Sequence, residues 1–199
     1  FNDNNKKKRI YTKKNLPTGN ISTNLFDGPS VTILTALIRK KSYLDMKIGF
    51  DKNYQIIGDL DFFVRFSKNN LFECFQEPLA TFRIHKNNFT KKNRDLEIQE
   101  LEHWLQNKNK LLSKKEIAWV EELILYKKNT ARILKKKSLS TIISILKFPN
   151  NFRKIKLLSA LLLPKSFLEK KKESASLYRT TISSSNHSSL SESIRSHFG

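Results

Sequence analysis

Apolar side chains recur every three or four residues through the second half of this 199-residue chain, and this spacing constrains the fold more than any other feature. It is clearest over residues 94–137, where a polar stretch at residues 107–116 interrupts it. Such a period places the apolar side chains on one face of an α-helix. Within the polar stretch, Ser113 and Glu116 form a capping-box pattern. We therefore predict two helices, which carry Leu96, Ile98, Leu101, Trp104, Leu105, Ile117, Val120, Leu123, Ile124 and Ile133.

Two shorter amphipathic segments follow at residues 139–148 and 152–163, and Pro149 divides them. Leu-rich sequence with flanking lysines is typical of a basic amphipathic helix that lies on an anionic membrane surface. The same pattern fits helices that pack against the rest of the protein and keep their lysines in solvent. The last stretch, residues 173–199, is rich in Ser and poor in apolar side chains, so we expect it to be disordered.

The first half of the chain carries signals for strands as well as helices. Residues 31–38 are β-rich and nearly all apolar, as in a strand that is buried on both faces. Residues 59–69 lack the alternation of a strand and start with Asp59, a good N-cap, so they predict a helix. The other expected elements are a loop at residues 1–29, a short helix at residues 39–46, and short strands at residues 71–76 and 79–85.

The chain is strongly basic, with 38 Lys and Arg, 18 Asp and Glu, and a formal net charge of +20. Such an excess suggests polyanionic partners: nucleic acid, acidic lipid or phosphate-bearing substrates. A bias that spreads Lys, Asn and Ile along the whole chain would give the same charge. Nucleic acid is the least supported partner, because the sequence has no zinc-ligand spacing, no RNA-recognition aromatic pattern and no helix–turn–helix spacing.

A single cysteine, Cys74, excludes an internal disulfide framework and fits a reducing compartment. It lies in an apolar run, so we expect a buried side chain. No apolar run approaches the roughly 20 residues of a membrane span. We expect a cytoplasmic location, or a peripheral position on the inner face of the membrane. Because the chain begins at Phe1 within a polar segment, we also expect a fragment of a longer protein.

Two carboxylates, Asp59 and Asp61, stand directly before an aromatic run. Asp61 lies four residues before Arg65, which is the spacing of a helical ion pair, and we favour this structural role for it. An ionised carboxylate at a helix start can also accept a proton from a bound hydroxyl group. The two-residue spacing of the acids alone does not decide between these roles.

Several short motifs follow one another in a fixed order around these acids: Gly49-Phe50-Asp51, Gly58-Asp59-x-Asp61-Phe62, Arg65, Pro78-Leu79-Ala80, Phe82-Arg83-x-His85 and Asn88-x-Thr90. This series resembles the C-terminal half of the catalytic domain of family 2 glycosyltransferases, which are inverting enzymes with the GT-A fold. The resemblance implies an α/β fold. Residues 1–93 would be the acceptor-side part of the transferase domain, and residues 94–172 would be a basic helical extension.

The resemblance implies that Asp59 is the general base, which deprotonates the hydroxyl group of a glycan or lipid-linked acceptor. That hydroxyl would attack the anomeric carbon of a nucleotide-sugar donor with inversion, and Asp61 would contact the substrate. A divalent metal, Mg²⁺ or Mn²⁺, would neutralise the leaving diphosphate. Gly58 stands where many members of the family carry Glu, which removes one candidate acid.

The resemblance also suggests roles for four residues on either side of these acids. His85 could reach the metal or the diphosphate, or it could hydrogen-bond a loop. Arg83 could neutralise a phosphate, or it could pair with a carboxylate such as Glu77. Asp27 and Gly28 match an acceptor-side loop.

The sequence also departs from the family in one important way. The family's N-terminal half carries βαβ nucleotide-binding elements and a separate Asp-x-Asp metal motif, and nothing before Val31 fits either feature. We therefore expect a fragment that lacks the main metal ligands and is inactive on its own. Two other classes remain open: a basic nucleic-acid-binding module, and a peripheral membrane-binding helical protein without catalysis.

Overall fold

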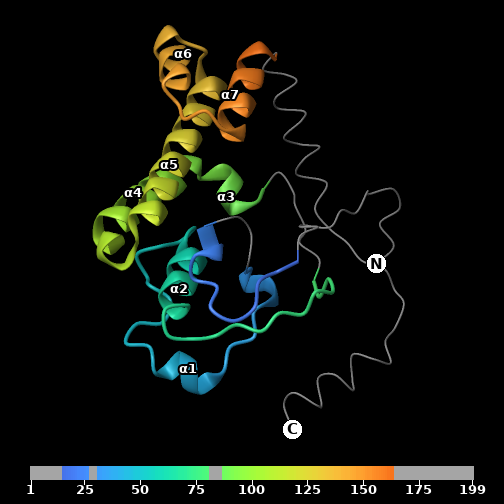
Figure 1. Ribbon diagram of the computed structural model, residues 1–199. Coiled ribbons are helices and arrows are strands. Elements are labelled where there is room, and N and C mark those ends of the chain that lie inside the picture. The colour runs from blue at the N-terminus through green and yellow to red at the C-terminus, as the bar shows by residue number, and fades with distance from the viewer. Residues whose placement is uncertain (1–14, 27–30, 81–86, 164–199) are drawn as a thin grey trace.

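Helices form the framework of the protein (Figure 1). The structure is a computed structural model, and it describes residues 15–26, 31–80 and 87–163. The α-helices are α1 (Lys40–Leu44), α2 (Gly58–Phe66), α3 (Phe89–Lys92), α4 (Arg94–Lys108), α5 (Lys114–Lys135), α6 (Leu139–Leu146) and α7 (Phe152–Leu162). Short 3-10 turns are η1 (Asn24–Phe26), η2 (Ile33–Thr35) and η3 (Asn109–Leu111).

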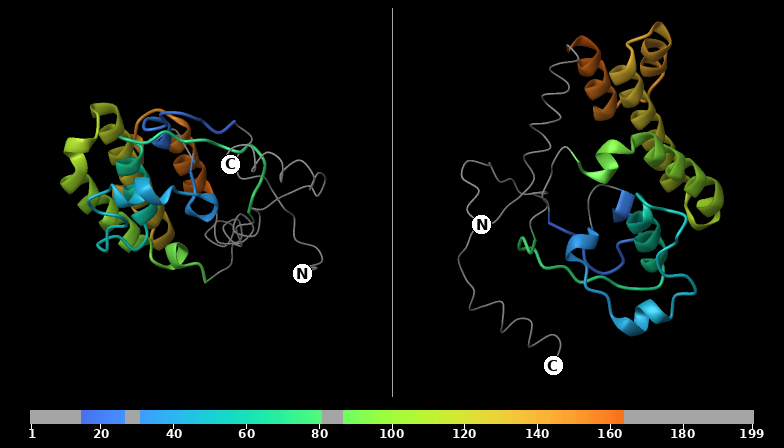
Figure 2. Two further views of the ribbon diagram at one scale, coloured as in Figure 1. Left: turned by 90° about the horizontal axis from the view of Figure 1, so that it is seen from below. Right: turned by 180° about the vertical axis from the view of Figure 1, so that it is seen from behind.

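The long helix α5 organises the arrangement. α4 runs antiparallel along it, and ion pairs join Glu97 to Lys127 and Glu102 to Lys128. α6 and α7 form a second helical hairpin that packs on α5. This hairpin lies at one end of the molecule, and α1 and α2 lie at the other end (Figures 1 and 2).

The helices that the apolar spacing predicts are present. The polar interruption separates α4 from α5, and Ser113 and Glu116 form the reciprocal capping box at the start of α5. α6 and α7 occupy the two amphipathic segments on either side of Pro149, and α1 lies within residues 39–46. These predictions are confirmed. α4, α5, α6 and α7 bury side chains of the faces that their spacing defines, whereas the short helix α1 has no buried residue.

The core has three parts. The largest cluster joins the first and second halves of the chain, and its members are Phe26, Tyr54, Ile57, Val64, Ile98, Leu101, Trp104, Leu112, Val120 and Ile124. A second cluster contains Phe62, Phe63 and Phe66 on α2. A third cluster, Ile133, Ile145, Phe148 and Leu157, holds the α6–α7 hairpin against α5.

The predicted α/β fold is wrong, because the described residues are all-helical. They contain no strand, and their β-type pairing is a single isolated bridge between Gly19 and Phe72. Residues 31–38, expected to be a buried strand, contain the turn η2, and Leu34 and Leu37 are 52% and 84% exposed. A strand requires partners for its backbone N–H and C=O groups, and no neighbouring described segment supplies a ladder.

Two local expectations are also wrong. α2 begins at Gly58 with Ile57 as its N-cap, so Asp59 lies inside the first turn instead of capping the helix. Residues 71–76 form no strand, and Cys74 is half-buried, with burial raising the pKa of its thiol. Most of the strand expected at residues 79–85, and the tail at residues 173–199, lie outside the described residues.

Candidate functional site

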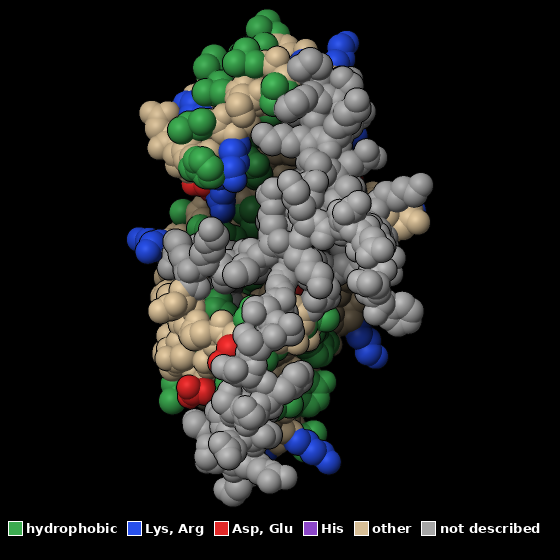
Figure 3. Space-filling view, turned by 90° about the vertical axis from the view of Figure 1, so that its right-hand side faces the viewer, with side chains coloured by type: hydrophobic (Ala, Val, Ile, Leu, Met, Phe, Trp, Pro, Cys, Tyr) green, Lys and Arg blue, Asp and Glu red, His purple; other side chains and the backbone are tan. Residues whose placement is uncertain are grey.

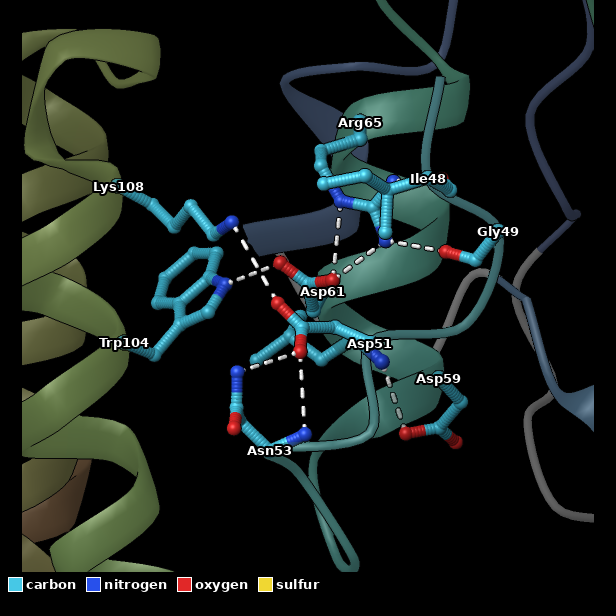
Figure 4. A network of polar contacts seen from close by, with 10 residues as sticks. Ile48, Gly49, Asp51, Asn53, Asp59, Asp61, Arg65, Trp104 and Lys108 are labelled. Carbon is cyan, nitrogen blue, oxygen red and sulfur yellow. Dashed lines mark hydrogen bonds and ion pairs between the residues drawn. The ribbon is translucent and has the colours of Figure 1, made fainter. Parts of the chain in front are cut away.

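The Asp61 carboxylate lies at the centre of a polar network at the start of α2 (Figure 4). Asp61 is fully buried, and its Oδ1 accepts a hydrogen bond of 2.9 Å from Nε1 of Trp104 on α4. Its Oδ2 accepts two hydrogen bonds from the Arg65 guanidinium, from Nε at 2.9 Å and from Nη2 at 2.6 Å. The predicted helical ion pair is therefore confirmed, and the buried carboxylate orients side chains instead of facing solvent.

Arg65 extends this network to the preceding loop. Its Nη1 donates to the carbonyl oxygen of Ile48 at 2.6 Å, and its Nη2 donates to that of Gly49 at 2.6 Å. The loop continues into Phe50, whose ring stacks on Phe62 of α2 at a centroid distance of 4.3 Å. One guanidinium thus fixes the position of the loop on the surface of α2.

A second buried carboxylate, Glu100 on α4, holds the chain just before α2. Its Oε1 accepts from the backbone N–H of Gln55 at 2.8 Å, and its Oε2 accepts from those of Ile56 and Ile57 at 2.9 and 3.1 Å. These three N–H groups lie just before Gly58, the first residue of α2. By accepting from all three, Glu100 ties the chain that enters α2 to α4.

Asp51 lies at the edge of this network. Its Oδ1 accepts hydrogen bonds from the backbone N–H and the side-chain amide of Asn53, at 3.0 and 2.9 Å. Its Oδ2 is 3.7 Å from Nζ of Lys108. The hydrogen bond from the Asn53 backbone, reinforced by the charge of Lys108, lowers the pKa of Asp51 below its ordinary value.

Asp59, the predicted general base, lies on the opposite side of the α2 start from Asp61 (Figure 4). It is exposed, and its Oδ1 accepts a hydrogen bond of 2.8 Å from the backbone N–H of Leu60. The two acids therefore differ sharply: one is a buried anchor, and the other is a carboxylate in contact with solvent.

The other predicted site residues are not brought to this place by the described structure. Asp27, Gly28, Arg83 and His85 lie outside the described residues, as does any metal contact of His85. Across residues 15–26, 31–80 and 87–163, no group of three or more His, Cys, Asp or Glu side chains could hold a metal ion. The divalent metal therefore stays a prediction.

A second candidate site is the outer face of the α6–α7 hairpin. Exposed apolar side chains follow helical spacing along both helices, namely Leu139, Ile142, Ile143 and Leu146 on α6, and Phe152, Ile155, Leu158 and Leu162 on α7. We call these eight residues the apolar face. Figure 3 shows hydrophobic side chains gathered at this end of the molecule. A cluster of exposed large apolar side chains of this size is typical of an interaction surface.

The charged side chains of the hairpin itself have one sign. All charged side chains of residues 139–163 are basic: Lys147, Arg153, Lys154 and Lys156. Lys147 and Lys156 are exposed, and Nζ of Lys156 lies 4.3 Å above the ring of Phe152. No helix among the described residues is long and apolar enough to cross a membrane.

Comparisons with protein-family models, with curated proteins and with solved structures gave no match. The resemblance to family 2 glycosyltransferases is therefore wrong as a family assignment. No family model supports it, and the all-helical described residues do not fit part of a GT-A sheet. The motif series failed because each of its pieces is short and common, so its order alone did not specify a fold.

Proposed function

We propose that the protein attaches peripherally to anionic lipid surfaces through the apolar face of α6 and α7. The observation that carries the proposal is the combination of eight exposed apolar side chains with purely basic charge on one helical hairpin. A helix that lies in a membrane interface needs an apolar face for the acyl boundary and basic residues for the headgroups. Both features are present in the hairpin, and no helix among the described residues is long and apolar enough to cross a membrane.

The two contributions are of similar size. Each Lys or Arg near an anionic surface is worth about 1 kcal/mol, so the exposed Lys147 and Lys156 contribute about 2 kcal/mol at low salt. Each buried CH₂ group adds about 0.8 kcal/mol, so partial insertion of a few Leu and Ile side chains is worth as much again. Stable attachment generally requires two such signals, and the hairpin carries both.

The proposal is tested by sedimentation of the full chain with vesicles. The protein should pellet with vesicles of phosphatidylcholine and phosphatidylglycerol, and should stay in the supernatant with phosphatidylcholine alone. The double substitution Ile143→Glu and Leu146→Glu should abolish pelleting, because both side chains are exposed and neither belongs to the buried cluster. The matched control is Leu37→Glu, which changes an 84% exposed leucine outside the hairpin and should leave pelleting unchanged.

A charge series separates lipid from other polyanions. Lys147→Glu with Lys156→Glu should weaken pelleting more than tenfold, whereas Lys114→Glu with Lys115→Glu, at the other end of α5, should have a small effect. Equal loss of pelleting in both lysine pairs would show nonspecific polyanion binding and would refute the lipid proposal. Binding to duplex DNA that survives Ile143→Glu with Leu146→Glu would refute it in the same way.

A second candidate function is sugar transfer from a nucleotide-sugar donor to an acceptor hydroxyl group, with Asp59 as the base. One observation favours it: Asp59 is exposed at the start of α2, while Asp61 and Glu100 anchor that helix from below. A base must reach the proton that it abstracts, and a fixed helix start would hold it in place.

This second candidate is tested by turnover of the chain fused to a nucleotide-binding domain. Asp59→Asn should abolish transfer and leave donor binding largely intact. The control Asp45→Asn changes another exposed carboxylate, at the end of α1, and should leave transfer unchanged. Turnover by the Asp59 variant at the unsubstituted rate would exclude Asp59 as the base.

A further inference from the structure

One buried polar side chain in the described structure has no hydrogen-bond partner. Asn129 on α5 is 0% exposed, and neither its Nδ2 nor its Oδ1 makes a hydrogen bond. A buried amide normally finds partners for both atoms, because leaving them unpaired is costly. Its position on α5 shows which packing contact the unpaired amide destabilises.

Asn129 belongs to the stripe of α5 that faces the α6–α7 hairpin. Residues three and four apart share a helix face, so Asn129 lies between Tyr126 and Ile133 on one stripe. Ile133 is buried in the cluster that holds the hairpin, and Leu125 and Tyr126 pack against the same cluster. The unpaired amide therefore weakens the contact between α5 and the hairpin near its centre.

Besides this apolar cluster, the hairpin is held by polar contacts away from Asn129. Arg153 donates to Glu122 at 2.6 Å and lies 5.0 Å above the ring of Trp119. Lys137 donates to the carbonyl oxygens of Leu161 and Leu163 at the far end of α7. The apolar cluster has four fully buried members, and four partly buried side chains pack against them.

We propose that the α6–α7 hairpin opens away from α5 at Asn129 and that anionic lipid binds the opened form. This inference rests on the proposed lipid attachment and adds its mechanism. Opening frees the inner side chains Ile145, Phe148 and Leu157, so that the inner side of the hairpin, as well as the apolar face, becomes available to the acyl boundary. α6 suits this role, because six of its eight residues from Leu139 to Leu146 are Leu, Ile or Thr and none is charged.

The opened population then sets the apparent affinity for lipid. When only a fraction of molecules is competent to bind, the apparent dissociation constant is raised by the inverse of that fraction. Asn129→Leu replaces the unpaired amide with an apolar side chain of similar size. It should slow amide exchange in α6 and α7 about tenfold and lower the fraction bound to vesicles several-fold.

A second variant should favour the opened form, and it changes a residue of α5 and none of the hairpin. Ile133→Ala removes apolar contact from the α5 side, so it should speed amide exchange in α6 and α7 and raise vesicle binding. The control Asn107→Leu changes an exposed asparagine on α4 and should alter neither measurement. Hydrogen exchange by mass spectrometry and vesicle sedimentation are measured on the same full-length preparations.

The outcomes separate the inference from the function on which it rests. If the unsubstituted protein does not pellet with phosphatidylglycerol vesicles, lipid attachment fails, and the inference fails with it. If it pellets, and Asn129→Leu and Ile133→Ala pellet equally well, lipid binds the closed hairpin; the inference is then overturned and the attachment stands. Faster exchange or a lower melting temperature in Asn129→Leu would show that the amide is satisfied in solution, which also overturns the inference.

Discussion

Replacing Asp61 with Asn should destabilise the protein far more than the same change at Asp59. Asp61 is 0% exposed, and the Arg65 side chain with which it pairs is 14% exposed, so neither charge is well solvated. Asp61→Asn keeps the volume but leaves the guanidinium without its counter-charge, and turns one acceptor into a donor. Breaking a buried ion pair from one side costs about 3–5 kcal/mol. For a chain of this size the melting temperature should fall by about 10 °C.

The measurement is urea unfolding followed by tryptophan fluorescence, because Trp104 itself donates to Asp61. Asp59→Asn is the matched control, since an exposed carboxylate should change the free energy of unfolding by less than about 0.5 kcal/mol. Trp104→Phe, combined with Asp61→Asn in a double-mutant cycle, should show coupling above about 0.5 kcal/mol. Equal destabilisation by the two Asp→Asn variants would refute the assignment of Asp61 as the buried anchor.

Three further predictions follow from the same packing. Glu100→Gln should lower the free energy of unfolding by about 2 kcal/mol in urea titrations, because a neutral amide replaces a carboxylate that accepts three backbone hydrogen bonds. The lowered pKa of Asp51 means that its ionised form stabilises the fold above the ordinary value of 3.8, and that this contribution is lost as pH falls through the lower folded pKa. Asp51→Asn should therefore flatten the acid limb of a stability-against-pH curve. Ser113→Ala removes the cap of α5 and should cost about 1 kcal/mol, measured by urea unfolding with circular dichroism detection.

The helices of the second half could be predicted because their stability is local in origin. α4 and α5 bury the faces that their spacing defines, and the capping box lies within four residues of sequence. A period of three to four residues sustained over many turns has few alternative structures. The same holds for α6 and α7. Their amphipathic segments are shorter, but Pro149 marks the boundary between the two helices.

The first half could not be predicted in the same way, because its structure depends on distant partners. Residues 31–38 are short and apolar, and such a run fits a strand or a packed irregular segment equally well. Here Val31, Ala36 and Ile38 pack on the phenylalanines of α2, and no second strand pairs with the segment among the described residues. The failed prediction assumed a sheet that the described chain does not form.

The anchors of α2 were missed for a related reason, although the sequence held a signal. Glu100 is next to Leu101 and four residues before Trp104, so it lies at the buried face of the predicted helix. A carboxylate on a buried face requires donors, and the chain before α2 supplies three backbone N–H groups. The spacing thus predicted that Glu100 needed partners, but the identity of those partners is a property of the tertiary fold.

The buried polar side chains of the molecule differ in whether they have hydrogen-bond partners. Asp61 and Glu100 are buried, and their oxygens bind Trp104, Arg65 and backbone N–H groups, so they are unavailable to a ligand. Asn129 is also buried but unpaired, and it lies under the hairpin that carries the apolar face. Satisfied buried groups hold α2 on α4 firmly, and the unsatisfied one weakens the hold of α5 on α6 and α7. Because the buried polar groups at the start of α2 are hydrogen-bonded and the Asn129 amide is not, we expect the hairpin to separate from α5 more readily than α2 separates from α4.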